Sequence, residues 1–216
     1  MTTYDKIATT YDRFYSKSEH EKEDRKVIDS LISWLLPPTT SMLDLGCGTG
    51  AALDIIRNVG FVIEDYVGVD SSKLMLSEFQ KKDMNLPYSV LIEASFDDDD
   101  LIDRIRTGGP NRRSHYDLVT AFYCIQYSSD PISTLVGVGE LMHDLSALVT
   151  ITYSNSFVST DDYIVRDHID HQKYHSWEEI FESEKFNSTF EVTARVKYGV
   201  SDDGSHKFDL THSRRR

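Results

Sequence analysis

Three closely spaced glycines, Gly46, Gly48 and Gly50, follow the acidic residue Asp44. A glycine-rich turn between a buried strand and a helix lets a ligand approach the backbone closely and presents amides at the helix N-terminus. A second acid, Asp70, lies at the separation expected for a carboxylate that holds ribose hydroxyls. The pattern therefore predicts a nucleotide site built from a glycine turn and two carboxylates.

Two kinds of nucleotide could fit this turn. The spacing Gly46-x-Gly48-x-x-Ala51 matches the dinucleotide fingerprint, whose glycines accommodate a pyrophosphate. Asp44 argues for the other kind, because a carboxylate there would repel a pyrophosphate but suits the ammonium of a methionine moiety. We favour a methionine-bearing nucleotide over a dinucleotide and over a glycine turn that binds nothing.

A second set of chemically capable residues lies further along the chain. Three histidines, His168, His171 and His175, fall at i, i+3 and i+7, so on a helix they would share one face. The preferred interpretation is that they are solvated or lie on the surface of a lid. A base or acceptor-contacting role and a metal site with Asp167 and Asp170 remain open as alternatives. No metal is expected.

Strand and helix patterns alternate in a way that places these residues along one edge of a sheet. Alternation of this kind predicts a doubly wound α/β fold with a parallel sheet, and ligands of such sheets bind at the carboxyl ends of the strands. A closing antiparallel hairpin is expected around the turn 201–204. The predicted strands are 42–45, 65–69, 89–92, 116–121, 147–153, 190–198 and 206–212, and the predicted helices are 51–56, 72–82, 98–106, one from Pro131, and 177–184.

One domain is expected over residues 1–216. Its parts are a helical cap (1–40), a cofactor-binding core (41–153), an acceptor-side insertion (154–176), and a last helix with the hairpin (177–216).

The glycine run also carries a family resemblance. The stretch 43–50, Leu-Asp-Leu-Gly-Cys-Gly-Thr-Gly, resembles the first motif of class I S-adenosylmethionine-dependent methyltransferases, and the stretch 66–75 resembles the second. The layout is similar to that family over about residues 4 to 213. The resemblance implies a Rossmann-like, mostly parallel seven-stranded sheet with a C-terminal antiparallel hairpin, and S-adenosylmethionine as cofactor.

The resemblance also implies roles for individual residues. Asp44 and backbone groups of Gly46 and Gly48 would hold the methionine end, and Asp70 would hold the ribose hydroxyls. Glu93, where the family usually has Asp, would accept from the adenine amino group, and the Ala94 amide would meet the ring. The full expected cofactor set is Tyr11, Asp44, Gly46, Cys47, Gly48, Asp70, Ser71, Met75, Glu93, Ala94, Ser95 and Phe122.

Methyl transfer is an in-line displacement, so the acceptor atom must be held in line and water excluded. The candidates for handling the acceptor are Tyr123, Tyr127 and His171, with packing alone as the competing interpretation for the two tyrosines. The expected cap and acceptor-side insertion, together with the lack of a separate basic or protein-binding domain, favour transfer to an N or O atom of a small molecule. The alternatives are an RNA cap or tRNA methyltransferase, and a non-catalytic methyltransferase-fold partner protein.

The charge balance disfavours polyanionic partners. Asp and Glu number 36 against 23 Lys and Arg, a formal charge of −13, which repels nucleic acid and anionic lipid. The arginines at 112–113 and 214–216 are interpreted as a loop and a solvated tail, and the acids 97–100 as a solvated helix start.

No signal-peptide or membrane-span pattern occurs, and neither Cys47 nor Cys124 is in a CxxC pair. Cys47 is expected as a small residue tolerated in the tight turn, and Cys124 as a buried filler. A cytoplasmic monomer or homodimer is therefore expected.

Overall fold

The computed structural model describes residues 4–15, 22, 26–28, 41–82, 84–109, 115–153, 177–200 and 206–216. Seven strands form one sheet in the order β3-β2-β1-β4-β5-β7-β6. Their bounds are β1 Ser41–Leu45, β2 Asp65–Asp70, β3 Tyr88–Glu93, β4 Tyr116–Phe122, β5 Met142–Tyr153, β6 Phe190–Val200 and β7 His206–Arg215. Strands β1 to β5 are parallel, and β7 pairs antiparallel with both β5 and β6. The predicted fold class is confirmed.

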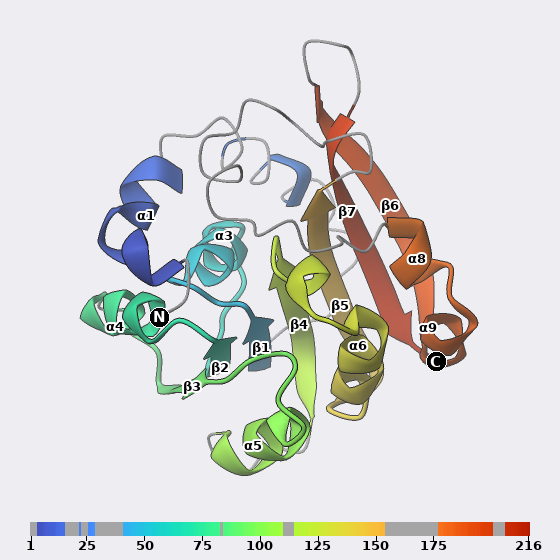
Figure 1. Ribbon diagram of the computed structural model, residues 1–216, viewed down its shortest axis with the longest axis horizontal. Coiled ribbons are helices and arrows are strands. Elements are labelled where there is room, and N and C mark those ends of the chain that lie inside the picture. The colour runs from blue at the N-terminus through green and yellow to red at the C-terminus, as the bar shows by residue number, and fades with distance from the viewer. Residues whose placement is uncertain are drawn as a thin grey trace.

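The helices of the described chain connect and cover these strands. In Figure 1, α1 lies beside α4 near the β2–β3 side of the sheet, and α8 and α9 lie beside the β6–β7 hairpin. The helical bounds are η1 Tyr4–Lys6, α1 Ala8–Tyr15, α3 Ala51–Asn58, α4 Lys73–Lys81, α5 Leu101–Gly108, η3 Ile125–Tyr127, α6 Pro131–Gly139, α8 Trp177–Phe181 and α9 Glu184–Thr189.

Alternate strand residues supply two separate cores, one on each face of the sheet. Leu43 and Leu148 belong to the core that includes residues of α5, α6, α8 and α9, whereas Met42 and Val149 belong to the core with α3 and α4. Strand side chains point to opposite faces in turn, so a strand buried on both faces reads as a continuous apolar run. This explains why 42–45 and 116–121 were recognisable from sequence.

The sheet order reverses between β1 and β4. From β1 the chain moves outward to β2 and β3, then returns to place β4 and β5 on the other side of β1. Loops that leave the carboxyl ends of β1 and β4 therefore diverge, which is the position where doubly wound sheets bind ligands.

The C-terminal third differs from the sequence-based expectation. The arginines 214–216 are not a solvated tail, because β7 continues to Arg215 as an internal strand. Arg215 donates to the Met142 carbonyl, and the Arg216 amide donates to the carbonyl of Thr189 at 2.9 Å. The helix predicted over 177–184 is two helices, because Ser183 caps α9 by accepting from the amide of Phe186 at 3.1 Å.

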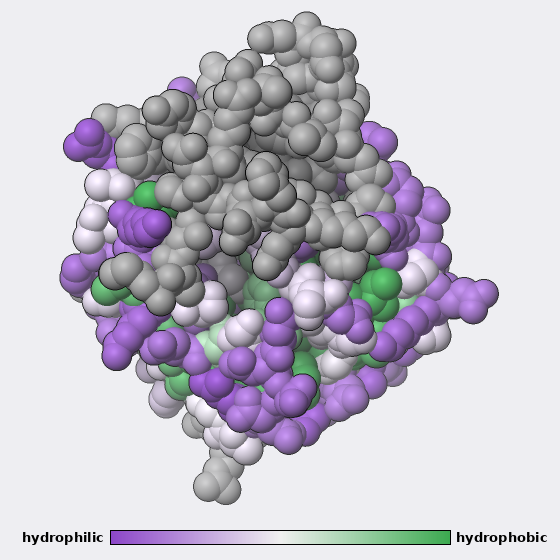
Figure 2. All heavy atoms as spheres, in the orientation of Figure 1, coloured by the Kyte–Doolittle hydropathy of each residue, from purple (hydrophilic) through white to green (hydrophobic). Residues whose placement is uncertain are grey.

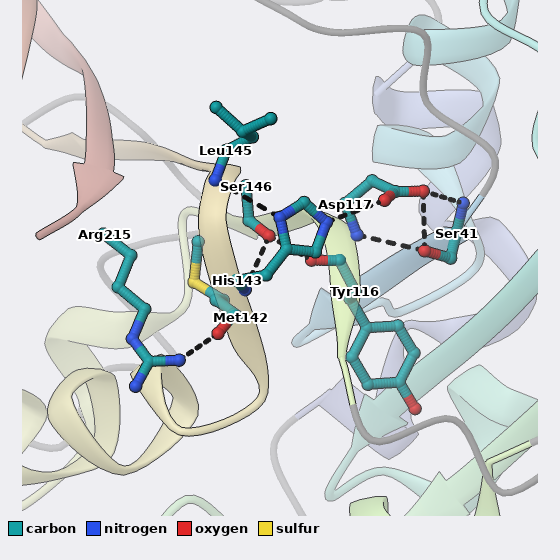
Figure 3. Close-up of polar contacts among 8 residues, drawn as sticks. All are labelled: Ser41, Tyr116, Asp117, Met142, His143, Leu145, Ser146 and Arg215. Carbon is teal, nitrogen blue, oxygen red and sulfur yellow. Dashed lines mark hydrogen bonds and ion pairs between the residues drawn. The ribbon is translucent and has the colours of Figure 1, made fainter.

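A polar network joins the amino ends of β1, β4 and β5 (Figure 3). Asp117 accepts from the Ser41 hydroxyl at 2.8 Å through one oxygen, and its other oxygen lies 3.1 Å from His143 Nε2. A register shift between Tyr116 and Leu118 accompanies it: their partners on β5 are Met142 and Ala147. Asp117 stands between the serine and the histidine, so the network holds strands together and is not a nucleophile–base pair.

Several expected features lie outside the described residues. These are Arg112-Arg113, the turn 201–204, most of the cap between residues 16 and 40, and the insertion 154–176 with its three histidines. Within the described residues, no helix is long and apolar enough to cross a membrane. In Figure 2 the coloured part of the visible face is largely hydrophilic, with hydrophobic residues in small patches between.

Candidate active site

The glycine turn after β1 is made by backbone conformations that favour glycine. Gly46, Gly48 and Gly50 have φ values of 64°, 52° and 95°. A Cβ on Gly46 would lie 2.4 Å from Cys124 Cβ, and one on Gly50 would lie 2.6 Å from Phe79, whereas one on Gly48 would meet nothing within 4 Å. The outer glycines are therefore packed against the protein, and Gly48 faces open space.

Asp70 at the end of β2 is held directly beside this turn. Its Oδ2 accepts from the Gly48 amide at 2.9 Å, and its Oδ1 accepts from the Ser72 amide at 2.7 Å. Burial raises the pKa of Asp70, and these two amides oppose that shift. The sequence-predicted glycine turn and ribose carboxylate are thus brought together at the carboxyl edge of the sheet.

Asp44 lies behind the turn, within the sheet, and is only 1% exposed. Its Oδ1 accepts from the Thr120 hydroxyl at 2.7 Å, and its Oδ2 accepts from the Tyr66 hydroxyl at 2.9 Å. Burial raises the pKa of Asp44 to about 7, although both hydroxyls act to lower it. Each oxygen of Asp44 thus accepts one hydrogen bond from the protein, as each oxygen of Asp70 does, and direct contact between Asp44 and a methionine ammonium stays a prediction.

Tyr66 and Thr120 were missed by sequence reasoning. They meet Asp44 only because β2 and β4 flank β1 in this register, with Gly68 and Thr120 opposite Asp44. The residue opposite Asp44 on β2 has to be glycine for steric reasons, since a Cβ on Gly68 would lie 2.8 Å from Cys47 Sγ. Cys47 is buried, in agreement with its expected place in the tight turn.

The residues expected around adenine follow β3 and begin α4. Ala94 donates its amide to the Asp70 carbonyl at 3.1 Å, so the amide that the resemblance assigns to the ring is already used in the sheet. Glu93 is exposed at the end of β3, opposite Asp70. Met75 is buried and Ser71 is exposed, and the Ser95 amide donates to Asp98 at 3.0 Å.

The N-terminal cap is bonded to the same region. Asp5 accepts from the Ser72 hydroxyl at 2.6 Å. Asp12 accepts from the Thr49 hydroxyl in the glycine turn and forms an ion pair with Lys82 at 2.8 Å. These contacts place η1 and α1 against the glycine turn and the start of α4.

Tyrosines join the cap to the loop after β4. The Tyr4 ring lies 6.4 Å from the ring of Tyr11 and 6.4 Å from that of Tyr127, in both cases edge to face. Tyr123 has a φ of 55°, which is uncommon for a residue with a side chain, and its hydroxyl lies 3.1 Å from that of Tyr198. Strained backbone of this kind is frequent at functional sites.

The described residues therefore bring together an open glycine turn, a carboxylate beside it and the tyrosines that join the cap to the loop after β4. A family model described as a methyltransferase domain matches residues 16–193. The chain belongs to the class I S-adenosylmethionine-dependent methyltransferases. It is an enzyme of that family, and S-adenosylmethionine is its cofactor.

Solved structures share the fold of this methyltransferase at low sequence identity. A complex of the Haloferax volcanii Trm112 methyltransferase activator with a methyltransferase matches at TM-score 0.69 and 17% identity, over 98% of this chain and 95% of that one. A Clostridium acetobutylicum S-adenosylmethionine-dependent methyltransferase matches at 0.63 and 16%, over 98% of both. The plantazolicin methyltransferase BamL matches at 0.66 and 14%, over 97% of this chain and 90% of that one. Comparison with curated proteins found no match.

One of the acids after β3 of the methyltransferase, Asp97, has a different role from the one expected, whereas Asp99 and Asp100 are exposed and Asp100 is the N-cap of α5. Asp97 is not simply solvated, because its Oδ1 accepts from the amide and hydroxyl of Ser129 at 2.9 and 2.8 Å. It thereby ties the loop after β3 to the loop after β4. Helix α5 begins only at Leu101, so the run 97–100 precedes the helix. The described residues contain no group of three metal-ligating side chains.

The residues at the end of β4 and directly after it are buried to different degrees. Cys124 is buried, as expected, and donates its thiol to the Leu45 carbonyl at 3.0 Å. Phe122 is partly buried at the end of β4. Gln126 is only 3% exposed, and within the described part of the chain neither its amide nitrogen nor its amide oxygen has a partner. His171 lies outside the described residues.

Proposed function

We propose that this methyltransferase transfers the methyl group to a nitrogen or oxygen atom of a small molecule. The observation that carries the proposal is the cap, which is hydrogen-bonded to the glycine turn through Asp12 and Thr49 and packed on Tyr127 through Tyr4. A cap held in this way would cover the reaction point, and a covered site suits a small acceptor better than a long polymer. The formal charge of −13 also disfavours RNA.

The residues present fit the cofactor. Open space at Gly48 allows the methionine end to approach the turn, and Asp70 is placed to accept from ribose hydroxyls. When bound, S-adenosylmethionine supplies a methyl group on a positively charged sulfur. The ionised form of Asp44, buried behind the turn, would favour the positive charge of the bound cofactor.

Tyr123 and Tyr127 are proposed to orient the acceptor. Both follow β4, and their hydroxyls can accept or donate a hydrogen bond to an amine or a hydroxyl. A hydroxyl acceptor needs a group that takes its proton, and an amine acceptor must lose its proton before attack. His171 remains a sequence-based proposal for that base.

The location and oligomeric state of the protein are also proposed. We expect a cytoplasmic monomer or homodimer, and light scattering during size-exclusion chromatography decides the oligomeric state. The Haloferax relative was solved with an activator protein, so co-expression with such a protein is a useful second condition for the activity assay.

The experiment is a transfer assay with isotopically labelled S-adenosylmethionine. The purified protein is offered a metabolite library and, in parallel, total tRNA and a protein extract. Label in a small molecule, and none above background in either polymer, is the expected result. Label in tRNA or protein with none in the library would overturn the proposal.

A further inference from the structure

One face of the sheet changes from apolar to polar along β5 and β7. Leu148 lies in the core beneath α8 and α9, but the next two residues of β5 on that face are Thr150 and Thr152. Directly opposite them on β7 stand Thr211 and Asp209. The polar side chains therefore gather at the carboxyl end of β5, where an acceptor is expected.

Three polar atoms of this group lack hydrogen-bond partners among the described residues: Thr150 Oγ1, Thr152 Oγ1 and Asp209 Oδ2. The three residues are 1%, 3% and 1% exposed. Buried polar groups are nearly always hydrogen-bonded. A buried group without a partner has lost its hydrogen bonds to water and has gained none in the protein, which destabilises the folded state. Several such atoms at neighbouring positions indicate that a bound partner completes them.

The carboxylate of Asp209 favours a hydrogen-bond donor at this place, and a charged donor such as an ammonium group makes the strongest bond to a carboxylate. Asp209 Oδ1 accepts from Arg195 Nε at 2.8 Å, and the same guanidinium lies 3.7 Å from Glu178 of α8. Asp209 Oδ2, the other oxygen of this carboxylate, has no hydrogen-bond partner among the described residues. A carboxylate oxygen only accepts, so the partner that completes Asp209 must donate.

The group also adjoins the proposed reaction point. Tyr123, directly after β4, donates its amide to the Ile151 carbonyl at 2.7 Å, and Thr152 is the next residue of β5. The Tyr123 side chain itself packs against the core on the opposite face of the sheet. A ligand nitrogen held by Thr152 and Asp209 would therefore lie near the backbone of the loop after β4, and not beside the Tyr123 ring. Enclosure of the ligand there is compatible with a reaction from which water must be excluded.

We propose that Thr150, Thr152 and Asp209 form a subsite that binds a protonated amine of the methyl acceptor. The inference rests on the proposed function and narrows it to acceptors that carry an ammonium group. Asp209 supplies the charge and the acceptor oxygen, and the threonine hydroxyls accept the remaining N–H groups.

The test uses valine in place of threonine, which keeps the shape and removes the hydroxyl. In Thr150→Val and Thr152→Val the melting temperature should rise by about 2–4 °C, because a buried hydroxyl without a partner is removed. The matched control is Thr134→Val, whose buried hydroxyl lies 3.1 Å from the Asp130 carbonyl. That variant should melt at a lower temperature.

Binding is measured by calorimetry with 1,3-diaminopropane and benzylamine as probes, and with 1,3-propanediol and benzyl alcohol as matched neutral compounds. Each titration is run with and without S-adenosylhomocysteine. The amines should bind, the alcohols should bind at least about tenfold more weakly, and Thr152→Val and Asp209→Asn should weaken amine binding at least about tenfold. Glu191→Gln removes an exposed charge of β6 and should leave binding unchanged.

Each result of these titrations either supports or overturns the proposed subsite. Absence of amine binding to the wild type, equal binding of amines and alcohols, or unchanged amine affinity in a thermally stabilised Thr152→Val would overturn the subsite and indicate internal water instead. The titration of S-adenosylhomocysteine alone tests the proposed function separately. If it binds and the amines do not, only the subsite is wrong.

Discussion

Asp70 contacts the backbone on both sides of the expected ribose position, through the amides of Gly48 and Ser72. We predict that Asp70→Ala weakens S-adenosylmethionine binding by about 1.5–3 kcal/mol, the range for lost hydrogen bonds to a charged group. Calorimetry measures this, with Asp144→Ala, an exposed acid of β5, as control. Unchanged affinity in Asp70→Ala would remove this carboxylate from the cofactor site.

Asp44 gives cofactor binding a dependence on pH. Its pKa of about 7 means that the free enzyme holds a neutral Asp44 below that pH and a carboxylate above it. A positively charged ligand favours the carboxylate, so S-adenosylmethionine affinity should rise from pH 6 to pH 8. Below pH 7, binding should release a proton, which calorimetry in buffers of different ionisation enthalpy detects. In Asp44→Asn this dependence should disappear; a slope that persists would assign it to another group.

His212 affects stability rather than binding. It is 2% exposed on β7, and burial lowers its pKa from 6.5 to about 4. The folded protein therefore keeps the ring neutral while the unfolded chain takes up a proton below pH 6.5. The contribution of the neutral His212 ring to the free energy of unfolding is fully present above pH 6.5. It is lost as the pH drops towards 4, by up to about 3 kcal/mol.

This prediction is checked by urea unfolding at pH 7.5 and pH 5. Other groups also titrate over this range, so the quantity compared is the difference between the two pH values in wild type and in His212→Phe. The loss of stability on acidification should be smaller in His212→Phe. An equal loss in both proteins would show that His212 does not carry it.

At the scale of single elements, the cap is held by two acidic residues on separate helical segments. Asp12 of α1 contacts Thr49 and Lys82, and Asp5 of η1 contacts Ser72. We predict that Asp12→Ala raises the KM for S-adenosylmethionine about tenfold, because loss of the hydrogen bonds loosens the cap over the glycine turn. The KM of Asp103→Ala, which removes an exposed acid of α5, should not change. Steady-state kinetics on the identified acceptor distinguishes the two.

Most strands and helices were predictable because each carries its own local pattern. The strands 42–45 and 65–69 and the helix after Gly50 appear within one residue or two of their expected bounds. The early start of β5 and the extension of β7 to Arg215 were not predictable, since both depend on pairing with distant strands. The register decides such boundaries, and no single segment encodes it.

The residues of the candidate site divide in the same way, into those that a local pattern reveals and those that depend on strand pairing. Gly46, Gly48 and Asp70 are recognisable because turn chemistry and spacing are local properties. Tyr66 and Thr120, which hold Asp44, lie on the strands flanking β1 and were missed. The polar group at Thr152 and Asp209 was missed for the same reason: its members meet only through the β5–β7 pairing.

At the scale of the whole molecule, the net charge sets which partners approach. With a formal charge of −13, the average surface repels phosphate backbones. We predict no RNA or DNA binding below about 100 μM at physiological salt, which fluorescence anisotropy with labelled oligonucleotides measures. Micromolar binding that weakens steeply with added salt would favour a nucleic-acid acceptor.

Strand β7 lies between β5 and β6, although it follows both of them in the chain. During biosynthesis β6 therefore leaves the ribosome before β7, its neighbour in the described part of the sheet, exists, and β5 presents an open edge for the same interval. Open apolar edges promote association between chains. A messenger truncated between the codons for residues 153 and 206 would thus yield a product with an exposed β5 edge, which we expect to accumulate in the insoluble fraction and to be degraded rapidly.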